Sequence, residues 1–299
     1  TEDSPHHSEM RISADSLKLV EDNKKLKLRI EVVYFTLPNT SFPGLGRIVK
    51  IINLGSKKRK IEMIDGLPIF IPYGFDDSLL KRLSTTIEAW CTVENLDKKA
   101  PYYKLKVMPA DITETKFLEK GNFFLAFDGK GSAASIIVDP NVVFGPNTSL
   151  EKPVNFLANN FTAPARQMTD GFTPSAFAYK KMELKGKEEF ELYSLFGQID
   201  RLELLNNMTD KLRRPGYLKA KYFENKYLID NLYSSVNTES ASKSFDLYSK
   251  YTFLDNVMRG GLPVKFGGKT TYLYYRKHGD MERDYNDFKL TPTYFSQGS

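Results

Sequence analysis

The sequence is poor in the residues that most often carry disulfide or metal chemistry. Its 299 residues include one cysteine, Cys91, and three histidines. A single cysteine excludes an internal disulfide, so we expect a reducing, cytoplasmic compartment. His6 and His7 lie in a polar N-terminal stretch, and no helical or loop spacing pairs His278 with another histidine, so we expect no metal site. Cys91 falls in an alternating strand pattern, which favours a buried structural thiol over a nucleophile.

Long apolar runs are missing as well. No stretch reaches transmembrane length, and the first residues are polar, unlike a signal peptide. With 41% hydrophobic and 27% charged residues the chain is expected to be globular. The net charge of +6 is modest, and no basic stripe repeats along one element, so we expect neither a nucleic-acid nor a membrane partner. The basic run 57–60 lies between a turn and a strand start, which favours a solvated hairpin.

Up to about Tyr193 the sequence alternates in the manner of antiparallel strands. The cleanest strand covers residues 26–35, with one apolar face that we expect to be buried: Leu26, Leu28, Ile30 and Val32. Further strands are predicted at 47–53, 61–65, 87–93, 103–107 and 123–127. The segment 66–74 contains two prolines and two glycines, which indicates a bent edge or a buried loop. Many short strands without helices between them predict a mainly β fold, a large antiparallel two-sheet sandwich over residues 1–196.

From Gly197 onward the apolar residues keep helical spacing. The pattern predicts linker helices over 197–243, broken by Arg213-Arg-Pro-Gly216. Ser244 is the expected N-cap of a further helix, which Gly260-Gly261 should end.

The stretch from Tyr272 to Gly298 mixes carboxylates, basic residues and aromatic rings more densely than any other part of the chain. Carboxylates and guanidinium groups bond sugar hydroxyls, and aromatic faces cover the apolar side of a pyranose ring. The pattern therefore suits a carbohydrate, although a surface segment with ion pairs would have a similar composition. Arg259 lies beside two glycines, which either let a ligand approach the backbone or form an ordinary helix end.

Several segments together resemble one known family. They are RIEVVYFTLP (29–38), IEMIDGLPIFIPYG (61–74), EAWCTVEN (88–95), LDNVMRGG (254–261), RKHGDMERDYN (276–286) and SQG (296–298). In this order they resemble the N-terminal part of the inverting glycoside phosphorylases of glycoside hydrolase family 94, in particular the 1,2-β-oligoglucan and cellobiose phosphorylase-like branch. The resemblance covers almost the whole chain.

This resemblance implies a β-sandwich, then linker helices, then an (α/α)6 barrel whose beginning would occupy residues 244–299. It implies phosphorolysis of β-gluco-oligosaccharides to α-glucose 1-phosphate with inversion, with inorganic phosphate as co-substrate and no other cofactor. The substrate-binding candidates gather near the Ser-Gln-Gly segment: Arg259, His278, Asp280, Arg283, Asp284 and Gln297. Relatives place the general acid and most of the phosphate site after this segment. No residue of this chain is therefore expected to be catalytic.

Two alternatives stay open. The chain could be a non-catalytic sandwich that binds a glucan or another partner. It could also be a lobe that mediates dimerisation, a role that the resemblance implies for the sandwich, so a homodimer is a further expectation. The residues do not decide between an enzyme and these two roles.

Overall fold

The computed structural model describes most of the chain and divides it into two compact units. Described are residues 6–75, 81–108, 113–158, 160–234, 236, 238–260, 264–266, 272–276 and 290–294. The units comprise residues 1–225 and 226–299, so the division falls within helix α4 (Tyr217–Ser234). The predicted domain boundaries at 196 and 243 stay predictions.

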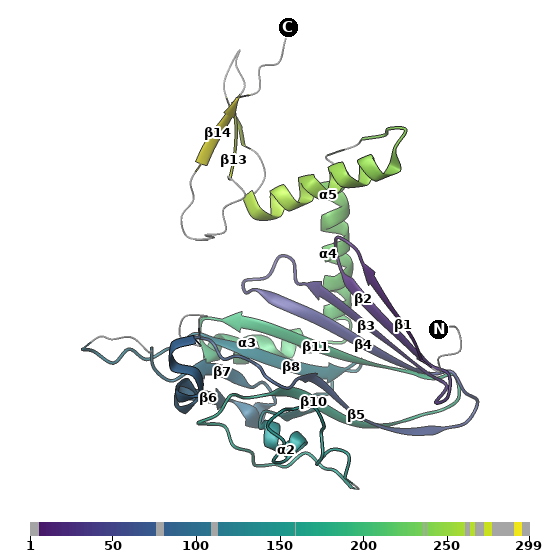
Figure 1. Ribbon diagram of the computed structural model, residues 1–299, viewed down its shortest axis with the longest axis vertical. Coiled ribbons are helices and arrows are strands. Elements are labelled where there is room, and N and C mark those ends of the chain that lie inside the picture. The colour runs from purple at the N-terminus through teal and green to yellow at the C-terminus, as the bar shows by residue number, and fades with distance from the viewer. Residues whose placement is uncertain are drawn as a thin grey trace. The chain divides into compact units, whose positions relative to one another are not determined.

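The first unit is built on an eight-stranded antiparallel sheet (Figure 1). Its strand order is β1-β2-β3-β4-β11-β8-β7-β6. The strands are β1 (His6–Ile12), β2 (Leu17–Asn23), β3 (Leu28–Thr36), β4 (Gly44–Asn53), β6 (Cys91–Glu94), β7 (Tyr102–Leu105), β8 (Gly121–Asp128) and β11 (Glu189–Ile199). The central strand β8 and the edge strand β6 are buried on both faces, whereas six of the seven residues of β1, at the other edge, are exposed.

A three-stranded antiparallel sheet packs against one face of the large sheet. Its order is β5-β10-β9, formed by β5 (Arg59–Leu67), β10 (Ala176–Leu184) and β9 (Ser135–Ile137). The two sheets share a hydrophobic core that includes Val49, Phe124 and Leu192 from the large sheet and Ile136 and Ala178 from the small one. The expected mainly β fold with two antiparallel sheets packed face to face is therefore confirmed for this unit.

Helices cover the outer faces of both sheets. Helix α3 (Leu202–Leu212) and the first part of α4 bury Leu205, Leu212 and Leu218 against the other face of the large sheet. On the small sheet, the short helix α2 (Pro140–Phe144) and the segment that follows it cover Phe177 and Tyr179. The first unit is thus layered as helix, large sheet, small sheet and short helix (Figure 1).

Two expectations about strands are wrong in part. Of the four residues predicted to be buried on one face, Val32 is buried and Leu28 is half-buried, but Leu26 and Ile30 are 46% and 36% exposed. Leu26 lies in the turn before β3, and the small sheet does not extend over Ile30.

The predicted strand 87–93 is the second correction. Residues 84–90 form a 3-10 helix, and only 91–94 are a strand. Ile87 and Cys91 are nevertheless both 1% exposed and lie in one core cluster with Leu105. A spacing of four residues places two side chains on the same side in a strand and in a helical turn alike, so the alternation did not distinguish them.

The helices begin close to where the sequence predicts them. Strand β11 continues to Ile199, and α3 starts at Leu202. Helix α5 (Lys243–Gly260) is preceded by Ser242, whose Oγ accepts a hydrogen bond from the N–H of Phe245 at 3.3 Å, so Ser242 and not Ser244 is the cap. The second unit also contains β12 (Val264–Phe266), β13 (Tyr272–Arg276) and β14 (Leu290–Tyr294), which form a small antiparallel sheet.

Candidate functional site

Five of the predicted sugar-site residues lie outside the residues that the structure describes: His278, Asp280, Arg283, Asp284 and Gln297. The sixth, Arg259, lies in α5, and its side chain is likewise outside the described part. In sequence, residues 278–284 fall between β13 and β14, which pair antiparallel from Tyr272↔Tyr294 to Arg276↔Leu290. The grouping of these six residues at a sugar cleft stays a prediction.

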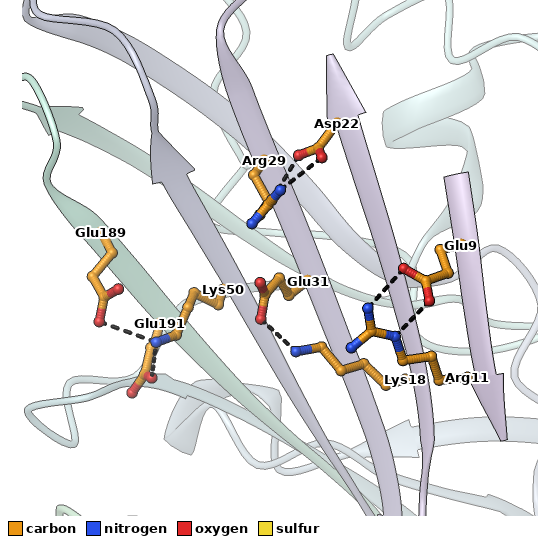
Figure 2. A network of polar contacts seen from close by, with 9 residues as sticks. All are labelled: Glu9, Arg11, Lys18, Asp22, Arg29, Glu31, Lys50, Glu189 and Glu191. Atoms are coloured by element: carbon orange, nitrogen blue, oxygen red, sulfur yellow. Dashed lines mark hydrogen bonds and ion pairs between the residues drawn. The ribbon is translucent and has the colours of Figure 1, made fainter. Parts of the chain in front are cut away.

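The most extended polar cluster of the first unit lies on one face of the large sheet (Figure 2). The sheet register places Glu9, Glu31, Lys50 and Glu191 in one row across β1, β3, β4 and β11. We call this cluster the ion-pair ladder. Its nine members are Glu9, Arg11, Lys18, Asp22, Arg29, Glu31, Lys50, Glu189 and Glu191.

The ladder pairs each of its cations with a carboxylate. Arg29 binds Asp22 through two bonds, Nε to Oδ1 at 2.6 Å and Nη2 to Oδ2 at 2.7 Å. Lys18 Nζ donates to Glu31 Oε2 at 2.8 Å. Lys50 Nζ lies 3.1 Å from Glu189 Oε1 and 3.4 Å from Glu191 Oε1. The five carboxylates nearly balance the four cations across the strands, so the ladder attracts neither anions nor cations strongly.

The electrostatics of the ladder argue against proton transfer there. The bond from Arg29 lowers the pKa of Asp22, and the bond from Arg11 lowers the pKa of Glu9. At Glu191 burial raises the pKa, but the Tyr193 hydroxyl and two lysines outweigh it and the net direction is down. A general acid at neutral pH needs a pKa raised toward 7. These carboxylates are shifted the other way, which gives the ladder a structural role.

A second polar group lies between the two sheets and was not predicted. Arg47 of β4 and Asp65 of β5 form an ion pair through Nη1 and Oδ2, with side chains only 12% and 9% exposed. The guanidinium carbon of Arg47 lies 5.2 Å from the centre of the Tyr34 ring. Burial lowers the pKa of Arg47, but Asp65 outweighs it, so the net direction is up.

Ser194 lies opposite Arg47 in the register and is fully buried, and its hydroxyl has no hydrogen-bond partner among the described residues. The sequence held a signal for this group. Arg47 alternates in phase with the core-facing Val49 and Ile51, and a charge at a core-facing position needs a buried partner.

Cys91 is buried as predicted, and burial, with a contribution from Glu88, raises the pKa of its thiol to about 12. A thiol with so high a pKa is not a nucleophile at neutral pH. Within the described ranges no group of three or more His, Cys, Asp or Glu side chains could hold a metal ion. None of the described helices has the length and hydropathy that a membrane crossing requires.

Neither a family model nor a curated protein matches the chain.

Proposed function

We propose that this chain is the N-terminal portion of an inverting glycoside phosphorylase that acts on β-gluco-oligosaccharides with inorganic phosphate. The observation that carries the proposal is the order of elements along the chain. Antiparallel sheets extend to Ile199, two helices follow, and a third helix begins at Lys243. This is the order that the resemblance to glycoside hydrolase family 94 implies, and the motifs quoted above occur in the same sequence order.

In this proposal the first unit supports the active site without supplying its chemistry. An inverting phosphorylase needs a carboxylic acid that protonates the glycosidic oxygen and a phosphate that attacks the anomeric carbon from the opposite face. The ladder carboxylates are paired with cations, and the pKa values of Glu9, Asp22 and Glu191 are lowered, which makes these three poor acids. We therefore assign the general acid and the phosphate site to a barrel downstream of this chain. Arg259, His278, Asp280, Arg283, Asp284 and Gln297 would line or support the sugar entrance.

The proposal predicts that residues 1–299 alone release no glucose 1-phosphate. The substrates to be tested are β-1,2- and β-1,4-gluco-oligosaccharides with inorganic phosphate, with product detected by a coupled assay. A protein extended through the barrel should release it, because general acid catalysis alone contributes roughly a hundredfold or more and the bound phosphate adds proximity.

Reactions without phosphate are the control for simple hydrolysis. Phosphate-dependent release by residues 1–299 would contradict our assignment of the acid, and an extended protein without activity would contradict the proposed function.

Dimerisation is a second candidate, and the edge strand β1 favours it. β1 pairs only with β2 among the described strands, and it exposes Met10 and Ile12 by 61% and 69%. An antiparallel pairing of two copies centred on Met10 places Glu9 opposite the partner subunit's Arg11, and the reverse. This register is self-complementary in charge, as a two-fold interface requires.

A charge-reversal pair tests this candidate. Arg11→Glu should weaken self-association by at least about tenfold, because two cross-strand attractions become repulsions. The double variant Glu9→Arg/Arg11→Glu restores opposite charges in the same register and should recover the dimer. Sedimentation velocity over a concentration series measures both. A wild-type chain that stays monomeric, or an Arg11→Glu chain that dimerises equally well, would exclude this interface.

A further inference from the structure

Three turns that are far apart in the sequence meet at one end of the two sheets (Figure 1). The N–H of Leu54 donates to the carbonyl of Lys27 at 2.9 Å, which joins the β2–β3 turn to the β4–β5 turn. The N–H of Lys187 donates to the carbonyls of Asn53 at 2.9 Å and Gly55 at 3.2 Å, which joins the β10–β11 turn to the same loop. We call this group of turns, residues 24–27, 54–60 and 183–188, the basic end.

The basic end concentrates the positive charge of the whole chain. It contains nine basic residues and two carboxylates, an excess of seven, while the full sequence carries +6. The basic residues are Lys24, Lys25, Lys27, Lys57, Lys58, Arg59, Lys60, Lys185 and Lys187. All eight lysines are exposed, and Arg59 is half-buried. Glu183 pairs with Lys58 and Lys60. The described part of the chain offers Lys24, Lys25, Lys27, Lys57 and Lys185 no ion-pair partner.

Two exposed leucines lie among these lysines. Leu26, between Lys25 and Lys27 in the sequence, is 46% exposed, and Leu54 is 37% exposed. The hydrogen bond from Leu54 to Lys27 brings the two turns that carry them together. Exposed apolar side chains surrounded by lysines suit an interface that has an anionic surface and an apolar interior beneath it.

The backbone adds an independent observation. Lys27 and Lys187 have φ values of 49° and 65°, in the left-handed region where glycine or asparagine costs less than lysine. The Lys187 ammonium donates to the carbonyl of Leu54 at 2.6 Å, so lysine has a local structural role at this position. For Lys27 local folding gains nothing from lysine, and strain at an exposed position of this kind points to a role for the side chain.

We propose that the basic end docks this protein peripherally on an anionic lipid surface. The lysines would lie at the headgroup level, and Leu26 and Leu54 would enter the acyl boundary. A lysine near an anionic leaflet raises the partition coefficient roughly fivefold, so several together produce measurable binding. The linear sequence gave no reason to expect a membrane partner, because the three turns become neighbours only in the folded sheets.

The composition of the basic end favours lipid over nucleic acid. Nucleic-acid surfaces combine basic residues with exposed aromatic rings for stacking and with arginine for bidentate contacts. The three turns contain no aromatic residue, and eight of their nine basic residues are lysine. Their exposed apolar side chains are leucines, which suit an acyl boundary better than a base stack.

Flotation of the purified chain with lipid vesicles tests the proposal. We expect binding to vesicles that contain about 30% phosphatidylserine, none to pure phosphatidylcholine, and loss of binding when salt is raised from about 0.1 M to 0.5 M. The double variant Lys27→Gly/Lys187→Gly should bind roughly 25-fold more weakly, since it removes two charges. Its melting temperature should change little, because glycine relieves both left-handed positions and so offsets the lost bond from the Lys187 ammonium to the Leu54 carbonyl. Leu26→Ser/Leu54→Ser should also weaken binding.

Lys99→Gly is the matched control. Lys99 is exposed and has a φ of 55°, but it lies in the β6–β7 hairpin and not in the basic end. This variant also loses one charge, but it should bind anionic vesicles nearly as well as the wild type, because that charge lies outside the basic end. The proposal would be overturned if the chain did not bind anionic vesicles, or if it bound neutral vesicles equally well. It would also be overturned if Lys99→Gly lost as much affinity for anionic vesicles as Lys27→Gly/Lys187→Gly. The proposal would also be overturned if the chain bound duplex DNA more tightly than anionic vesicles and if Leu26→Ser/Leu54→Ser left that DNA binding unchanged.

Discussion

Replacing Asn53 by alanine is expected to lower the free energy of unfolding of the first unit by about 3 kcal/mol. The Asn53 side chain is fully buried, and its amide donates to the carbonyls of Lys57, Leu184 and Lys185 at 2.8, 3.2 and 2.9 Å. Its Oδ1 accepts from the N–H of Gly55 at 3.1 Å. Alanine leaves several of these groups without a partner, and each such group costs roughly 1–3 kcal/mol when water cannot reach it.

Thermal and urea unfolding, followed by circular dichroism, measure this effect. The melting temperature should fall by roughly 6–12 °C for a unit of this size. Asn122→Ala is the control, because the Asn122 amide makes one bond, to the carbonyl of Ile71 at 3.0 Å, at an accessible position. It should cost less than about 1 kcal/mol. Equal losses in the two variants would show that the Asn53 side chain does not hold the β4–β5 and β10–β11 turns together.

The alternation of apolar residues predicted the central part of the sandwich because those strands are long and bounded by clear turns. Strand β8 shows the reason: it ends at Asp128, whose carboxylate accepts from the N–H groups of Lys130 and Ser132 at 3.0 Å in the turn that follows. The local turn chemistry and the apolar run therefore agree. In β1 and β2 they do not, because ion pairs such as Arg11–Glu9 take the place of apolar contacts. Residues 6–23 were accordingly not predicted as strands.

Most of the contacts that the sequence did not predict depend on pairing between strands that are far apart in the chain. The run 57–60 was correctly interpreted as a solvated hairpin, yet its neighbours at 24–27 and 185–187 follow only from the register of β3 with β4 and of β5 with β10. The same limit applies to Arg47 and Asp65. In the sequence, each of these charged residues occupies a position of its strand that is otherwise apolar. Only the packing of the two sheets shows that they are partners. The predicted sugar-site residues were named from their chemistry together with the resemblance.

Arg47→Met and Asp65→Leu are each expected to destabilise the first unit by about 3–5 kcal/mol. Each change leaves one charge buried between the sheets without its partner, and the nearby Tyr34 ring and Ser194 hydroxyl offer only weak compensation. The more accessible pair Arg29–Asp22 provides a chemical match, since it has the same residue types, although it is bidentate and its side chains are 39% and 21% exposed. Arg29→Met should cost less than about 1 kcal/mol, because water and salt screen that pair.

The double variant Arg47→Met/Asp65→Leu should recover most of the loss and unfold within about 1 kcal/mol of the wild type. The two apolar side chains would face the surrounding inter-sheet core, which includes Val49 and Met63, and neither would need a polar partner. Urea unfolding of the four proteins gives the coupling energy between the two positions. A large coupling would show that the pair is desolvated and retained for the specificity of the sheet packing. Additive losses in the double variant, or single losses as small as that of Arg29→Met, would show that water reaches this pair and that the sheets are held by their apolar contacts alone.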